Sequence, residues 1–69
     1  MQIALVVAVK QSAGAYTARI CKSRASSTQS AELAVQRAAE KYVAGTRLRV
    51  LSVNFDRGDN YRVVITDEQ

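Results

Sequence analysis

Apolar side chains occupy every position from Ile3 to Val9, and polar residues flank this run on both sides. A short Val-rich run of this kind is typical of a β-strand, which we predict over residues 2–10. Because both phases of the run are apolar, the strand is expected to be central in a sheet, with one face available to a partner. A second strand is predicted over residues 15–22, after a turn in which Gly14 supplies a positive φ.

The middle of the chain changes to a helical pattern. Residues 24–30 are rich in Ser and Thr and are predicted to form a polar loop. Ser27 and Thr28 are the expected helix N-caps, because a short hydroxyl accepts hydrogen bonds from the free amides of a first turn. The helix itself is predicted over residues 29–44 and should end at Gly45. Its apolar stripe is mostly alanine, so the helix can approach a sheet closely: Ala31, Ala34, Val35, Ala38, Ala39 and Tyr42.

Two more strands are predicted after the helix, over residues 47–55 and 61–66. Strict alternation breaks near Val50 and Leu51, which predicts either a β-bulge or burial of both faces at that point. The segment 56–60 contains Asp, Gly and Asn and is predicted to be the turn between the two strands.

The expected element order is strand, strand, helix, strand, strand, within one domain covering residues 1–69. This order predicts an α+β fold of ββαββ type, with a four-stranded antiparallel sheet and one helix packed on one face. The order of the strands within the sheet stays open. A single helix covers only one face, so the other face is left to solvent, a second subunit or a ligand. Strand phase places on that face Arg19, Arg62 and either Arg47 or Arg49.

Charge is spread unevenly along the chain, which has a formal net charge of +4. Residues 1–50 carry eight basic and two acidic side chains, whereas residues 51–69 carry two basic and four acidic ones. Residues 67–69 are predicted to be a frayed acidic tail. The basic excess on the first two-thirds of the chain favours an anionic partner.

The composition excludes several kinds of site. With no His and one Cys, the chain cannot build a His-based triad, a His-rich metal site or an internal disulfide. We therefore expect no catalytic activity, no metal and no cofactor. The lone cysteine favours a cytoplasmic location. The apolar run near the N-terminus is too short for a membrane span and lacks the preceding basic residue of a signal peptide, so no membrane partner is expected.

The basic face of the predicted sheet leads to the primary functional hypothesis. We expect a small non-catalytic binding module for nucleic acid or a nucleoprotein complex, because arginine bridges phosphates and stacks on bases. The predicted contact residues are Arg19, Lys22, Arg24, Arg47, Arg49 and Arg62. Lys22 and Arg24 are included because they precede the hydroxyl-rich loop at the expected helix start. All four aromatic residues fit the core phase, which disfavours a sheet that stacks on single-stranded RNA.

Residues 27–42 read Ser-Thr-Gln-Ser-Ala-Glu-Leu-Ala-Val-Gln-Arg-Ala-Ala-Glu-Lys-Tyr, and Gly45 and the pair 54–55 (Asn-Phe) follow. This stretch resembles the helix and tail of the plant Apetala-type DNA-binding domain and of the related arm-binding domain of phage integrases. The resemblance implies a sheet laid into the DNA major groove and braced by one helix. It also implies that residues 16–19 form a DNA-facing strand in which Arg19 is a contact.

In size and lack of motifs, the chain is also similar to small orphan proteins of bacteriophages and mobile elements, including anti-CRISPR inhibitors. This resemblance implies an alternative function, an inhibitor that binds a host defence or regulatory protein. A third alternative is a homodimer joined through sheet edges or open faces. The apolar phase formed by Ala4, Val6 and Ala8 suggests it.

Overall fold

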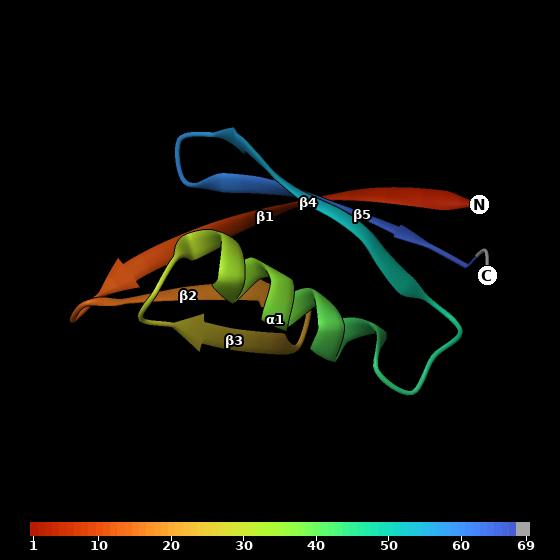
Figure 1. The fold of residues 1–69 in the computed structure, drawn as a ribbon, viewed down its shortest axis with the longest axis horizontal. Coiled ribbons are helices and arrows are strands. Elements are labelled where there is room, and N and C mark those ends of the chain that lie inside the picture. The colour runs from red at the N-terminus through yellow and green to blue at the C-terminus, as the bar shows by residue number, and fades with distance from the viewer. Residues whose placement is uncertain (68–69) are drawn as a thin grey trace.

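One helix lies across a five-stranded antiparallel sheet in the computed structural model, which describes residues 1–67 (Figure 1). The elements in chain order are β1 (Gln2–Ser12), β2 (Ala15–Ile20), β3 (Ser23–Ser27), α1 (Ala31–Val43), β4 (Arg49–Arg57) and β5 (Asn60–Thr66). The strand order across the sheet is β3-β2-β1-β5-β4. β1 is therefore the central strand, as predicted, and β3 and β4 are the two edges.

The predicted α+β class is confirmed, but the ββαββ order and the count of four strands are wrong. The segment assigned to a polar loop forms the extra strand β3, which pairs with β2 from Tyr16↔Ser27 to Ile20↔Ser23. Its sequence, Ser-Arg-Ala-Ser-Ser, has no β-branched or aromatic residue and so carries little strand signal. The turn before it also gives little signal, because it contains no glycine. Cys21 adopts the positive φ of 53° that a glycine would usually supply.

Side chains of α1 explain why so polar a segment is held as an edge strand. Lys41 Nζ donates to the carbonyl of Arg24 at 2.9 Å, and Arg37 Nη1 donates to the carbonyl of Ser26 at 3.2 Å. These two bonds satisfy acceptors that an edge strand would otherwise leave open. β3 is thus fixed on one side by β2 and on the other by the helix.

The two halves of β1 pair with different neighbours. Residues 2–8 pair with β5 on one side, and residues 9–12 pair with β2 on the other side. At the change-over, the amide of Val9 donates to the carbonyl of Asp59 at 2.9 Å. Because the two pairings are staggered along one long strand, the molecule is elongated, with extents of 37 × 24 × 18 Å.

The core lies between α1 and one face of the sheet. The buried apolar residues are Val7, Val9, Ala18, Ile20, Ala34, Val35, Ala38, Ala39, Val63 and Ile65. The helical part of this set belongs to the predicted alanine stripe, which allows the helix axis to approach the strands closely. On β1 only the phase of Val7 and Val9 is buried; the other phase is open, and Val6 is 61% exposed.

The N-terminus of the helix differs from the prediction by a few residues. Ser30 is the N-cap, and its Oγ accepts from the amide of Leu33 at 3.1 Å. The predicted caps Ser27 and Thr28 precede this position. Ser27 Oγ instead accepts from the amide of Gln29 at 3.1 Å, which makes a turn that leads into the helix. Ser27, Thr28 and Ser30 could each cap a helix. Because β3 extends to Ser27, the helix begins later and Ser30 becomes the N-cap.

Two predicted turn glycines and one predicted irregularity are confirmed. Gly14 has a φ of 79° in the β1–β2 turn, and Gly45 has a φ of 76° just past the end of α1. The β4–β5 register shifts between Val50 and Ser52, so Leu51 occupies a β-bulge. The bulge returns β4 to the phase in which its apolar residues share a face with those of β5.

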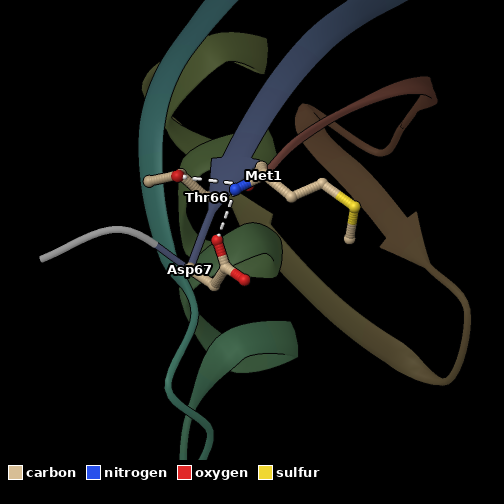
Figure 2. Close-up of polar contacts among 3 residues, drawn as sticks. All are labelled: Met1, Thr66 and Asp67. Carbon is tan, nitrogen blue, oxygen red and sulfur yellow. Dashed lines mark hydrogen bonds and ion pairs between the residues drawn. The ribbon is translucent and has the colours of Figure 1, made fainter.

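The two ends of the described chain are bonded together (Figure 2). The Met1 ammonium donates to Asp67 Oδ1 at 2.7 Å, and Thr66 Oγ1 donates to the carbonyl of Met1 at 3.2 Å. The hydrogen bond from the ammonium, followed by its charge, lowers the pKa of Asp67. The predicted frayed tail is therefore wrong for Asp67, while the remaining tail residues, 68 and 69, lie outside the described residues.

Candidate nucleic-acid interface

The sheet face away from α1, called the open face below, is identified by the strand register, because directly paired residues lie on the same face. Ala4, Val6 and Ala8 of β1 lie on it, together with their partners in neighbouring strands. Its basic members are Lys10, Arg19, Arg24, Arg49, Arg57 and Arg62. The predicted placement of Arg19 and Arg62 on this face is confirmed, and the register selects Arg49 rather than Arg47.

Arg19 and Arg24 are direct partners in the β2–β3 pairing, and both are exposed. Arg19 Nε donates to the carbonyl of Cys21 in the adjoining turn at 2.8 Å. This bond restrains the guanidinium while leaving its terminal nitrogens able to donate elsewhere. The hairpin thus presents two guanidinium groups side by side.

These two arginines border a hollow of about 420 Å³ on the open face. The hollow is lined by Ala8, Lys10, Thr17, Arg19, Cys21 and Arg24. The hollow exists because Ala8, Thr17 and Cys21 have small side chains. The three cations surround it. No carboxylate lines it, and within residues 1–67 none of the three cations forms a salt bridge. The hollow is therefore a concentrated positive site of a size that suits an anionic group.

The other three basic residues of the open face, Arg49, Arg57 and Arg62, continue the charge along the sheet. Arg62 lies opposite Val6, and Asp56 approaches its guanidinium at 3.7 Å, which offsets part of its charge. Arg49 pairs with Thr66 at the far end of β4. Measured along β1 at about 3.3 Å per residue, the stretch from the level of Arg49 to that of the hollow covers roughly 20 Å.

Two predicted contact residues lie outside the strands of this face. Arg47 is in the loop between α1 and β4, and Lys22 is in the β2–β3 turn. The expectation that Lys22 and Arg24 lie beside the helix start is wrong. Arg24 is held by Lys41 near the C-terminal end of α1, because β3 runs between these cations and the helix N-cap.

Lys10 is a site residue that the sequence analysis did not select. Its register partner is Thr17, which puts it on the open face and at the hollow. The signal was present in the pattern, since Lys10 continues the non-buried phase of a strand whose other phase is Val7 and Val9. The predicted contact residues did not include Lys10, although it is the last residue of the strand predicted over residues 2–10.

Aromatic side chains lie away from the open face. Phe55 and Tyr61 are paired on the helix side of the β4–β5 hairpin, with ring centroids 5.6 Å apart and a T-shaped geometry. Tyr16 is on the same side of the sheet, and Tyr42 is in α1. The expected core phase is therefore confirmed, but Phe55 is 62% exposed because it lies near the tip of the β4–β5 hairpin.

Other site chemistry is limited in the described part of the chain. Within residues 1–67, no three His, Cys, Asp or Glu side chains gather as a metal site would require. Over the same residues, no helix is both long and apolar enough to cross a membrane. Comparison of the chain with known protein families, with curated proteins and with solved structures found no match.

Proposed function

We propose that this chain is a non-catalytic binding module that contacts the phosphate backbone of a nucleic acid with the open face of its sheet. The observation that carries the proposal is the hollow bordered by Lys10, Arg19 and Arg24, in which no carboxylate competes for the cations. Phosphate oxygens accept bidentate hydrogen bonds from guanidinium groups, so a cross-strand pair of arginines suits them.

The rest of the open face supports phosphate contact more than base stacking. Arg62 and Arg49 extend the positive charge along the sheet, and none of the four aromatic residues is on this face. Single-strand binders rely on exposed aromatic side chains for stacking. A surface built from cations and small residues instead favours sequence-independent binding to the backbone.

The proposal is tested by fluorescence anisotropy with a labelled DNA duplex, and with single-stranded DNA and RNA of the same sequence, at several salt concentrations. We expect binding at low salt that weakens as salt is raised, because counterions are released from the phosphates. The double variant Arg19→Gln/Arg24→Gln should flatten the slope of log K against log salt by about 1.8 on duplex DNA, at roughly 0.9 per phosphate contact.

The control removes one charge elsewhere, and its effect is compared per charge removed. In Arg47→Gln the substituted residue lies in the loop between α1 and β4, outside the strands of the open face and without a role in holding β3. This control should leave the salt slope nearly unchanged. The proposal fails if no nucleic acid binds at low salt, or if the control flattens the slope as much as the open-face variant does.

A further inference from the structure

Side chains of α1 form hydrogen bonds with the backbone of one edge strand of the sheet, β3, and not with the other, β4, among the described residues. The carbonyls of β3 at Arg24 and Ser26 are bonded by Lys41 and Arg37. At the other edge, β4 has β5 on one side only. Among the described residues, no helix side chain and no loop amide bonds the backbone of residues 50–57. Alternate amides and carbonyls along this edge therefore point out of the sheet and can pair with another strand.

A groove runs along this open edge, between β4 and α1. Its volume is about 510 Å³, and the side opposite the helix is formed by Leu48 and by residues 49–53 of β4, which include one cation, Arg49. Val50 and Val53 are half-buried there, and Leu51 is 41% exposed. The groove thus combines an unpaired strand edge with a partly apolar floor, which is the combination that recognises an extended peptide by β-augmentation.

The helix wall of the groove is acidic. Glu32, Gln36 and Glu40 line it at intervals of four residues. Gln36 Nε2 donates to Glu40 Oε1 at 3.2 Å. Within residues 1–67, neither glutamate forms a salt bridge. The basic side chains Arg37 and Lys41 are directed to the opposite flank, toward β3. A helix on a chain of net charge +4 thus has both of its carboxylates along the groove beside the open β4 edge, and Glu40 also borders the hollow that Arg37 and Lys41 line beside β3.

From this geometry we propose that the groove between α1 and β4 binds an extended segment of another protein, with the pattern basic–x–apolar–x–basic. Eight residues separate Glu32 from Glu40, which is about 12 Å along a helix at roughly 1.5 Å per residue. Side chains four residues apart on a strand lie on one face and are separated by about 13 Å. Two Lys or Arg residues at this spacing match both carboxylates, and the apolar residue between them faces the groove floor.

A second copy of this chain does not fit the pattern. Among its ten Lys and Arg residues, only Arg37 and Lys41 are four positions apart, and they lie in α1 rather than in a strand. The occupant is therefore a different protein. This inference does not rest on nucleic-acid binding, because the groove runs along the β4 edge, whereas the hollow of Lys10, Arg19 and Arg24 is lined by residues of β1, β2 and β3 and of the β2–β3 turn.

The test uses nuclear magnetic resonance titration of the ¹⁵N-labelled protein with two capped peptides of equal composition. One contains Lys-Thr-Val-Thr-Lys, and the other contains Lys-Thr-Val-Lys-Thr, which puts its lysines on opposite strand faces. We expect the first peptide to bind more tightly and to shift amides of β4 and of the acidic flank of α1. Glu32→Gln/Glu40→Gln should weaken its binding about tenfold.

Two controls keep the result specific. Asp56→Asn/Asp59→Asn removes two carboxylates near the β4–β5 turn and should leave peptide binding unchanged. Arg19→Gln/Arg24→Gln should also leave it unchanged, which separates this proposal from nucleic-acid binding. The proposal is overturned if neither peptide binds, if both bind equally, or if β4 amides shift with protein concentration alone, since the last result would assign the groove to a second copy.

Discussion

Arg19 and Arg24 face each other directly across the β2–β3 pairing, so two cations occupy positions where opposite charges or apolar pairs would stabilise the hairpin. Among residues 1–67, no carboxylate forms a salt bridge with either. The repulsion between the two arginines lowers the stability of the free protein, and an anion bound between them would offset that repulsion. The pair therefore links the proposed function to a measurable stability effect.

We expect Arg24→Thr to stabilise the free protein by about 0.5 kcal/mol, because it removes the like-charge pair and introduces a β-branched residue in a strand. The same variant should weaken nucleic-acid binding. Urea denaturation at low and high salt measures the first effect, and the gain should shrink at high salt because the repulsion is screened. Arg62→Thr is the matched control, since it removes one charge from the same face but breaks the ion pair with Asp56. If both variants stabilise equally, the cross-strand repulsion is not the cause.

Ala13 has a φ of 52° in the two-residue turn between β1 and β2. A residue with a Cβ is disfavoured there, and the first position of such a turn, with Gly14 following, is commonly Asn. We predict that Ala13→Asn raises the free energy of unfolding by about 0.5–1 kcal/mol. Thermal denaturation followed by circular dichroism measures it. Ala44→Asn, at an exposed alanine with a φ of −60°, should give no comparable gain; a similar rise in both would contradict the backbone explanation.

The Met1–Asp67 pair gives a pH dependence of defined sign. The neighbouring ammonium lowers the pKa of Asp67 below its ordinary value of 3.8. The ionised carboxylate therefore stabilises the folded state above that pH, and the stabilisation is lost as pH falls through the lowered pKa. The stability difference between the natural sequence and Asp67→Asn should be constant near neutral pH and vanish in acid. Denaturation curves of both proteins at several pH values measure this difference, and a difference that stayed unchanged in acid would contradict the ion pair.

The main error in the sequence-based fold concerned β3. Its five residues carry no β-branched or aromatic side chain, so local propensity alone assigned them to a loop. They form a strand because β2 pairs with them and because Arg37 and Lys41 bond their outward carbonyls from the helix. Those partners are distant in sequence, and no local pattern indicates them.

The candidate interface was predicted in part. Strand phase was enough to place Arg19 and Arg62 on the open face, because alternation along a strand is a local property. Phase could not choose between Arg47 and Arg49, since that depends on where β4 begins. It also could not show that Lys10 and Arg24 meet Arg19 around one hollow, because they come from three different strands.

The sequence by itself determined the α+β class, the alanine-striped helix, the break in alternation near Leu51 and the turns at Gly14 and Gly45, because each depends on the properties of neighbouring residues. Only the tertiary structure decided which edge of the sheet is closed and which is open. That outcome depends on which flank of α1 meets which edge: Arg37 and Lys41 close β3, while Glu32 and Glu40 line the groove beside β4. Helix orientation is set by packing against the whole sheet, and no short stretch of sequence contains it.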